Sequence, residues 1–160
     1  MEKTNALRIL EREHIPHTVR TYEGDITPEG IRNYGVQLTL ALGLDPERGF
    51  KTLAARGTSG LVYVYELPAA ASLDLKKAAK AVGEKAVELL PVREICEVTG
   101  YVRGGCSPVG MKKNYPVVFH KTAIQYESIY ISAGKIGLQV EVSPLDLIRL
   151  LHAQTADIIM

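Results

Sequence analysis

Residues 50–66 read FKTLAARGTSGLVYVYE, and they contain two β-rich runs, Phe50 to Ala55 and Leu61 to Glu66. The four residues between the runs, Gly57-Thr58-Ser59-Gly60, are typical of a hairpin turn. The pattern therefore predicts two adjacent antiparallel strands. Antiparallel strands need no crossover helix between them, so this stretch favours an α+β fold over a doubly wound parallel sheet.

Further strands and helices are predicted on both sides of this hairpin. The strand-like runs are His17 to Tyr22, Val117 to His120, Ser128 to Ser132, Gly137 to Val142 and a closing run from Ala156 to Ile159. Helical patterns cover residues 4–13, Thr27 to Gly43, Asp74 to Val82, Pro91 to Val98, and Ser143 through Leu151. The second of these begins with the cap Thr27 and Pro28, and the last with the cap Ser143 and Pro144. The second also has a predicted buried stripe of Ile31, Leu38, Ala41 and Leu42. Because the strands cluster, a mixed sheet or barrel with helices packed outside is expected.

Length and charge limit the possible functions. At 160 residues with 46% hydrophobic content, the chain is long enough for one compact domain, residues 1–160, and too short for two ordinary ones. The formal net charge of +1 provides no overall attraction to nucleic acid. Any RNA contact must therefore come from local cation clusters, such as Lys76, Lys77 and Lys80, or Lys112 and Lys113.

No metal site, cofactor or membrane segment is expected. The two cysteines, Cys96 and Cys106, lie ten residues apart, and the four histidines show no spacing that would complete a tetrahedral zinc site. The N-terminal residues carry no apolar signal core, and no window approaches the roughly 20 apolar residues of a membrane span. We therefore expect a cytoplasmic protein.

A glycine-rich segment, Thr99 to Lys113, contains four glycines, Pro108 and several cations within fifteen positions. Glycine permits positive φ and lets backbone N–H groups approach a ligand closely, and Pro108 restricts Ser107. Such a loop suits a polarised carbonyl or a phosphate, and a tight connection between strands is the alternative. The segment is not a phosphate-binding P-loop, because Met111 stands where that motif requires lysine.

Lys51 is a candidate for chemistry at such a site. It lies inside an otherwise apolar strand, where its side chain is expected on the face opposite Phe50 and Thr52. A lysine that faces a partly closed cavity can orient a phosphate or carbonyl oxygen, and desolvation lowers its pKa. The alternative is an exposed lysine on an edge strand, where it discourages aggregation.

Cys106, which precedes Ser107 in the glycine-rich segment, is a candidate nucleophile. A catalytic cysteine needs a nearby base, and the sequence does not show whether His120 or His152 comes close. An unrelated thiol enzyme that uses Cys106 is therefore one alternative for the function.

Four motifs occur in order along the chain. They are Phe50-Lys51-Thr52-Leu53, Leu73 to Lys80, Thr99 to Gly110 and Ile131 to Leu138. The set resembles the YbaK/EbsC family of freestanding aminoacyl-tRNA deacylases, relatives of the editing domain inserted in bacterial prolyl-tRNA synthetase. The resemblance extends from the first helix through Asp146, and the combination of motifs is far more specific than any one of them.

The resemblance implies a mixed, barrel-like β-sheet flanked by helices, and an enzyme that hydrolyses the 3′ ester of mischarged tRNA, typically cysteine or alanine on proline tRNA. Lys51 matches the family's strand lysine, which is expected to hold the terminal adenosine phosphate or the aminoacyl ester. Gly104 matches a loop glycine whose backbone faces the ester, and Ser132 matches a polar pocket residue. The other implied substrate-binding residues are Tyr22, Gly105, Ser107, Lys135 and Gln139.

Gln139 is one departure from the family pattern. Some relatives carry an acidic residue just after Gly-Leu in the Ser132 motif, whereas Gln139 is neutral and cannot act as a base. In the cysteine-specific members the substrate's own thiol is expected to attack its ester carbonyl, so the protein mainly positions groups. A catalytically silent module that docks on tRNA or a synthetase is a second alternative. Prolyl-tRNA synthetase is an expected partner, and no DNA or membrane partner is expected.

Overall fold

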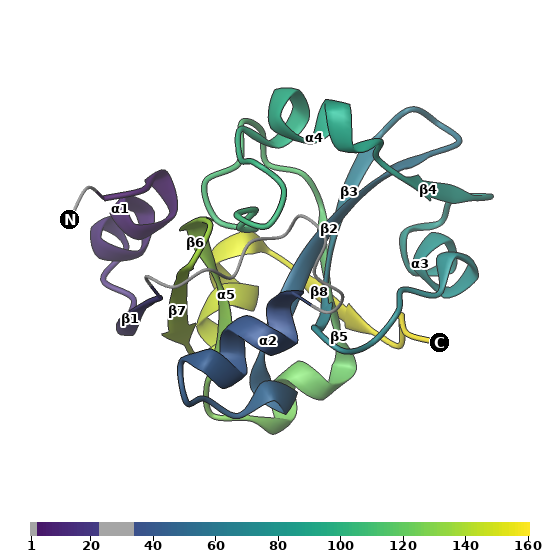
Figure 1. Cartoon of the computed structure of the whole chain (residues 1–160). Helices are drawn as coiled ribbons and strands as arrows, with labels where there is room; N and C mark the ends of the chain where they lie inside the picture. The colour runs from purple at the N-terminus through teal and green to yellow at the C-terminus, as the bar shows by residue number, and fades with distance from the viewer. Residues whose placement is uncertain (1–2, 23–33) are drawn as a thin grey trace.

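The computed structural model describes residues 3–22 and 34–160 (Figure 1). Its helices are α1 (Asn5–Arg12), α2 (Tyr34–Ala41), α3 (Leu75–Val82), α4 (Val92–Thr99) and α5 (Pro144–Leu151), with two 3-10 helices, η1 (Pro46–Arg48) and η2 (Lys121–Gln125). Its strands are β1 (His17–Thr21), β2 (Phe50–Gly57), β3 (Val62–Pro68), β4 (Val87–Leu89), β5 (Val117–His120), β6 (Ile129–Lys135), β7 (Leu138–Val142) and β8 (Gln154–Ala156). The predicted α+β class is confirmed.

The larger sheet has five strands in the order β4-β2-β3-β5-β8. The hairpin predicted in residues 50–66 is confirmed, since β2 and β3 pair antiparallel from Phe50 opposite Pro68 to Arg56 opposite Val62. β4 is also antiparallel to β2, whereas β5 and β8 run parallel to the strands they pair with. The sheet is therefore mixed, as the clustering of strands predicted.

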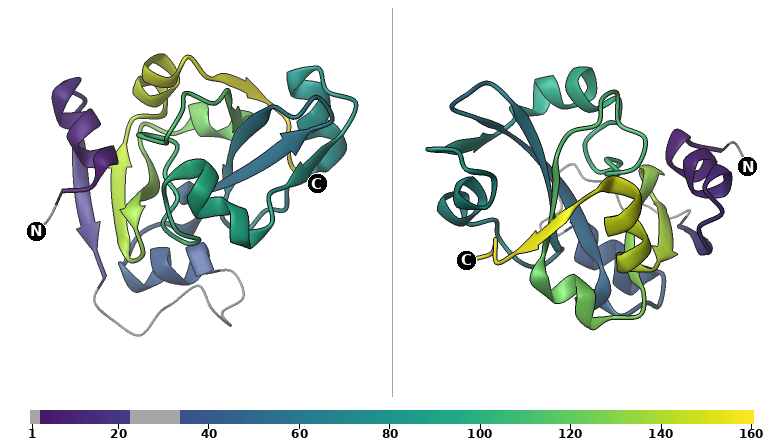
Figure 2. Two further views of the ribbon diagram at one scale, coloured as in Figure 1. Left: turned by 90° about the horizontal axis from the view of Figure 1, so that it is seen from above. Right: turned by 180° about the vertical axis from the view of Figure 1, so that it is seen from behind.

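The smaller sheet has three antiparallel strands in the order β1-β7-β6. An isolated bridge between Gly49 and Tyr130 joins β6 to the residue that precedes β2. In the described part of the chain the strands thus form two connected sheets rather than one closed barrel, which gives the barrel-like architecture that was predicted. Figure 2 shows the helices arranged around the outside of these strands.

Buried apolar side chains form two clusters, one on each face of the larger sheet. Val64 belongs to the first cluster and Tyr65 to the second, because successive side chains of β3 point to opposite faces. The first cluster joins both sheets to α1 and α5 through Leu7, Phe119, Ile131, Val140 and Leu147. The second joins the larger sheet to α3 through Ala55, Leu67, Ala78, Ala79 and Val118. β2, which carries Lys51, therefore belongs to a sheet with close-packed apolar side chains on both faces.

The helix ends follow the capping signals of the sequence with small shifts. Ser143 Oγ accepts a hydrogen bond from the backbone N–H of Asp146 at 3.3 Å, which confirms Ser143 as the cap of α5. Asp74 and Pro91 are the caps of α3 and α4 rather than their first residues, because a cap residue keeps an extended backbone. No helix within the described ranges has the length and apolar character needed to cross a membrane.

The predicted closing strand from Ala156 to Ile159 is wrong in position. The observed strand β8 ends at Ala156 and pairs with β5. Ile158 instead fills the second apolar cluster, and its backbone N–H donates to Nδ1 of His120 at 3.3 Å. The apolar residues after Ala156 thus pack into the core beyond the end of β8 instead of forming the strand. The sequence analysis also did not predict β4.

The second predicted helix is confirmed only in its later part. Thr27, Pro28 and Ile31 lie outside the described residues, and α2 is observed from Tyr34 to Ala41. Leu38 is buried as predicted. Ala41 is exposed, so the predicted buried stripe is wrong there, because the last residue of α2 lies beyond the covered face.

Candidate active site

A cavity of about 430 Å³ lies beside the first half of β2. Its walls come from α2, β2, β4, α4, the glycine-rich loop, β6 and β7, so segments far apart in the sequence meet there. β4 pairs with β2 only from Ala55 to Gly57, and the part of β2 before Ala55 borders the cavity. Much of the lining is apolar, with contributions from Leu38, Phe50, Leu53, Leu90, Ile95, Met111 and Leu138.

Four of the site residues implied by the family resemblance line this one cavity. They are Lys51 of β2, Gly104 of the glycine-rich loop, Ser132 of β6 and Gln139 of β7. Ser132 and Gln139 are directly opposite each other in the antiparallel pair β6–β7, which places their side chains on the same face. The fold thus brings together residues that are up to 88 positions apart (139 − 51). Their chemical roles stay predictions.

The other four predicted binding residues are not among the described residues that line the cavity. Ser107 is fully buried, and its Oγ accepts a hydrogen bond from the backbone N–H two residues later at 3.2 Å. Gly105 packs against the backbone of Lys135 and Ile136 at the turn between β6 and β7. Tyr22 follows β1, and its N–H donates to the carbonyl of Gly137 at 2.8 Å. These contacts support the walls of the site, and the predicted binding roles remain untested predictions.

Lys51 is half-buried at the cavity wall. Burial lowers the pKa of its ammonium group from the ordinary value, as its place inside an apolar strand predicted. An exposed edge-strand lysine is therefore not what the structure contains. A partly desolvated cation interacts more strongly with a phosphate or carbonyl oxygen than a fully hydrated one.

The glycine-rich loop is held in one shape by its own hydrogen bonds. Gly104 has a φ of +84°, a conformation that favours glycine. Thr99 Oγ1 accepts from the N–H of Tyr101 at 3.1 Å, and the Tyr101 hydroxyl donates to the carbonyl of Val109 at 2.7 Å. Burial raises the pKa of Tyr101 to about 12, so this hydroxyl stays protonated at neutral pH. The backbone of Gly104 is therefore presented to the cavity from a fixed loop.

Cys106 lines the cavity but lacks the surroundings of a nucleophile. Its sulfur contacts Thr99 Oγ1 at 3.8 Å and the carbonyl oxygen of Val102 at 3.5 Å, and neither group is a base. Burial raises the pKa of the thiol, which keeps it protonated at neutral pH. His120, one of the two histidines considered as its base, is the last residue of β5, and its Nδ1 accepts a hydrogen bond from the backbone N–H of Ile158. The contacts of Cys106 therefore favour a structural role.

Glu66 is a group near the site that the sequence analysis did not identify. It is fully buried on β3 directly opposite Thr52, whose Oγ1 donates to Glu66 Oε1 at 2.5 Å. Among the described residues, nothing is hydrogen-bonded to Oε2. Burial raises the pKa of Glu66 well above its ordinary value, so the folded protein favours the protonated carboxyl. The sequence did contain a signal for this buried acid, because Glu66 lies two residues after Val64 and therefore on the same face of an apolar strand.

Replacing Glu66 with glutamine is expected to stabilise the protein at neutral pH. The unfolded chain loses the Glu66 proton near the ordinary pKa of 4.5, while the folded chain keeps it to higher pH. Wild-type stability therefore falls as the pH rises through this interval, with a slope of up to about 1.4 kcal/mol per pH unit. Glutamine keeps an acceptor for Thr52 and does not ionise, so Glu66→Gln should show a flatter profile in urea unfolding from pH 5 to 8.

The exposed Glu127 provides the matched control for this prediction. Glu127→Gln makes the same chemical change at a side chain that stays in water in the folded and the unfolded protein, so the pH profile of stability should follow that of the wild type. If Glu66→Gln also kept the wild-type slope, the protonated state of Glu66 in the folded protein would be disproved.

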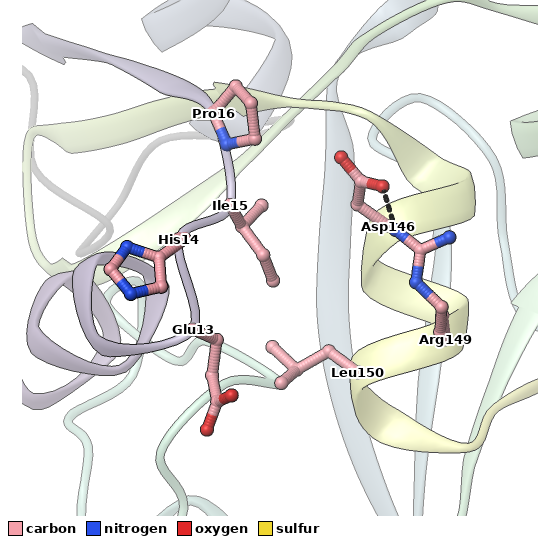
Figure 3. Close-up of a pocket in the computed structure, with 7 residues that line it drawn as sticks. All are labelled: Glu13, His14, Ile15, Pro16, Asp146, Arg149 and Leu150. Carbon is pink, nitrogen blue, oxygen red and sulfur yellow. Dashed lines mark hydrogen bonds and ion pairs between the residues drawn. The ribbon is translucent and has the colours of Figure 1, made fainter.

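A smaller cavity of about 230 Å³ lies between the end of α1 and α5 (Figure 3). Its charged lining includes Glu13 and an ion pair within α5 between Asp146 and Arg149. None of the residues predicted for the site lines it, so the larger cavity is the candidate active site. Over residues 3–22 and 34–160, no group of three or more His, Cys, Asp and Glu side chains could hold a metal ion.

The sequence model of a family described as "Aminoacyl-tRNA editing domain" matches residues 28–150. The chain belongs to the aminoacyl-tRNA editing family. The match covers well over half of the chain and contains β2, the glycine-rich loop, β6 and β7, which form the cavity. The family resemblance drawn from the four sequence motifs is therefore confirmed.

Individual relatives agree with this membership of the editing family. The chain is 39% identical over 160 residues to a protein of Enterococcus faecalis named "Putative Cys-tRNA(Pro)/Cys-tRNA(Cys) deacylase EbsC". The aligned region covers 98% of this chain and 93% of that protein. It is 27% identical over 126 residues to "Uncharacterized protein YwhH" of Bacillus subtilis, covering 78% of this chain and 80% of that protein.

Solved structures share the fold of this editing-family protein. One described as "a putative trans-editing enzyme for prolyl tRNA synthetase" matches with a TM-score of 0.82 and 23% identity, over 100% of this chain and 99% of the other. Another, the hypothetical protein APE2540, matches with a TM-score of 0.86 and 22% identity, over 98% of this chain and 100% of the other. At this level of identity the likeness establishes the architecture of the two sheets and their helices.

Proposed function

We propose that this member of the editing family is a trans-acting deacylase, which hydrolyses the ester between a wrongly attached amino acid and the 3′ end of tRNA. The observation that carries the proposal is that Lys51, Gly104 and Ser132 line one cavity. Family membership supports the substrate class. The name of the Enterococcus faecalis relative, a deacylase of cysteinyl-tRNA, supports the reaction.

Each of these residues has a role that its chemistry supports. The partly desolvated ammonium of Lys51 holds a phosphate or ester oxygen of the tRNA end. The backbone of Gly104 faces the ester, where an N–H group stabilises the oxygen that becomes negatively charged. Ser132 Oγ already accepts from the N–H of Gly134 at 3.2 Å, so its hydroxyl proton is available to the substrate. Together these groups position and polarise the ester carbonyl.

The described residues that line the cavity include no carboxylate and no imidazole. For a cysteinyl ester, the substrate's own thiol supplies the nucleophile that the wall does not. The sulfur attacks the ester carbonyl carbon, the bond from this carbon to the ribose oxygen breaks, and the thiol proton passes to that oxygen. The tRNA leaves with a free hydroxyl, and the protein contributes positioning and electrostatic stabilisation.

The finer assignments are also proposals. A cysteinyl or similarly small aminoacyl ester on proline tRNA is the proposed substrate, and prolyl-tRNA synthetase is the proposed partner that shares this tRNA. The cytoplasm, where charged tRNA is made and used, is the proposed location. Residues 1–160 are proposed to act as one editing domain.

The test is a deacylation panel with the purified protein. Cysteinyl-, alanyl- and prolyl-tRNA(Pro) are incubated with the protein, and the fraction of intact ester is followed over time. We expect the cysteinyl or alanyl ester to be lost far faster than in buffer, and prolyl-tRNA(Pro) to stay intact because it is correctly charged. Loss of no mischarged ester above the buffer rate would contradict the proposal.

The same panel separates the enzyme from a silent binding module. A module that only docks on tRNA would show saturable binding of all these tRNAs without ester loss. Binding that weakens with salt is expected in both cases, because each lysine–phosphate contact releases counterions. Turnover of more than one equivalent of ester per protein is therefore the deciding measurement.

A further inference from the structure

Gln139 is a buried amide whose oxygen lacks a hydrogen-bond partner. The residue is 6% exposed and lines the cavity, and among the described residues nothing donates to Oε1. Leaving a buried amide oxygen unpaired is unfavourable, and nearly all buried polar groups in proteins are paired. The oxygen of Gln139 is therefore a candidate for contact with a bound ligand.

The charged side chains of the cavity wall are cations. Lys51 and Arg103 are both lining residues, and the described lining contains no Asp or Glu. These cations suit the parts of an aminoacylated nucleotide that accept hydrogen bonds, namely its phosphate and ester oxygens. They cannot accept a hydrogen bond from the substrate.

The hydroxyl groups of the wall are engaged as well. The oxygen of Ser132 accepts from the N–H of Gly134 at 3.2 Å, which leaves its proton to donate. The hydroxyl of Thr52 donates to Glu66 at 2.5 Å. These hydroxyl oxygens keep a lone pair, but the amide oxygen of Gln139 is the buried acceptor among the described side chains of the wall that receives no hydrogen bond at all.

An aminoacyl ester carries its strongest donors on the α-ammonium group, beside the ester carbonyl. We propose that Gln139 Oε1 accepts a hydrogen bond from this α-ammonium group and makes the site selective for esters of free amino acids. The inference rests on the proposed deacylase function. Ser132, the cross-strand neighbour of Gln139, lies on the same face of the sheet, so the hydroxyl that serves the ester and the amide that serves the ammonium are adjacent.

Two kinds of ester are disfavoured by this arrangement. An ester without the amino group leaves Oε1 buried and unpaired, which raises the free energy of the bound state. An N-acylated ester, such as the end of peptidyl-tRNA, keeps only one N–H and adds bulk where the ammonium would lie. Gln139 would therefore direct the enzyme to aminoacyl-tRNA and away from peptidyl-tRNA.

The test compares cysteinyl-tRNA with 3-mercaptopropionyl-tRNA, which differ only in the α-amino group. Each kcat/KM is divided by the spontaneous hydrolysis rate of the same ester, because the amino group also activates the carbonyl. We expect the wild type to prefer the cysteinyl ester by about 10- to 100-fold. Gln139→Met keeps the length of the side chain and removes the acceptor. It should lower the normalised kcat/KM for cysteinyl-tRNA by this factor and leave that for 3-mercaptopropionyl-tRNA unchanged. Gln139→Glu keeps an acceptor and should retain the preference.

Gln125, which is exposed on η2, provides the control, and Gln125→Met should keep both values. An equal loss on both esters in Gln139→Met would show a structural role and overturn the inference. A wild type that hydrolyses both esters equally would also overturn it, while leaving the deacylase proposal intact. Failure to hydrolyse either of these esters, together with no loss of alanyl-tRNA(Pro) in the deacylation panel, would instead contradict the deacylase proposal itself.

Discussion

Lys51→Ala is expected to lower kcat/KM for mischarged tRNA by about 100- to 1,000-fold, the range seen when one preorganised electrostatic contact to a reacting oxygen is removed. Lys51 is half-buried in the cavity wall, and its cation is the group best placed to hold a phosphate or ester oxygen there. The fold should survive, because among residues 3–22 and 34–160 the Lys51 side chain forms no hydrogen bond or ion pair. Single-turnover deacylation and a thermal unfolding scan measure the two effects separately.

The pH dependence gives a second readout for Lys51. Burial lowers the pKa of its ammonium, so the charged form is lost at a lower pH than for an exposed lysine, whose pKa is 10.5. Binding of a hydrolysis-resistant 3′-amide analogue should therefore weaken as the pH rises toward 10. In Lys51→Arg the guanidinium stays charged throughout this range, so the alkaline loss of binding should disappear.

The control for Lys51 is Lys85, an exposed lysine in the segment before β4. Lys85→Ala removes the same charge from the protein but no group of the cavity, so kcat/KM should change by less than about 2-fold. Wild-type kcat/KM in Lys51→Ala would show that the cation of Lys51 plays no part in the reaction.

The hairpin and the clustered strands were predictable because they depend on local signals. Gly57 to Gly60 is a turn between two apolar runs, and Ser143 is a helix cap with Pro144 behind it. The position of β8 was not predictable, because the burial of Ile158 depends on a contact with His120, 38 residues away. Local patterns fix an element, whereas tertiary burial decides its exact ends.

The composition of the site was predictable only through the family motifs. Periodicity places Lys51 on a strand and Gly104 in a loop, but it does not say that the two meet, because their meeting depends on how β2 and the loop pack. Ser107 illustrates the opposite limit. The family resemblance implied that it binds substrate, yet it is fully buried, because its hydroxyl is used to shape the loop. Glu66 was missed since burial of an acid is a property of the packed sheet.

Gly105→Ala is expected to lower kcat/KM by about 10-fold through a displacement of the loop. A Cβ at position 105 would lie 3.1 Å from the backbone nitrogen of Ile136 and 3.2 Å from Cα of Lys135. Both atoms belong to the backbone of the turn between β6 and β7, so they cannot rotate away as a flexible side chain would. The loop must instead retreat by a few tenths of an ångström, and Gly104 moves with it, so the backbone that faces the ester loses part of its alignment.

Gly60 separates this displacement from the general cost of replacing a loop glycine. Gly60 has a φ of +93° in the β2–β3 turn, and an added Cβ would meet nothing within 4 Å. Gly60→Ala should therefore destabilise the protein by about 1–2 kcal/mol through backbone strain alone and leave kcat/KM unchanged. Gly105→Ala should show the reverse, a large loss in kcat/KM with a modest change in Tm. If both variants kept wild-type kcat/KM, the close packing of the loop on the β6–β7 turn would not be what holds Gly104 at the ester.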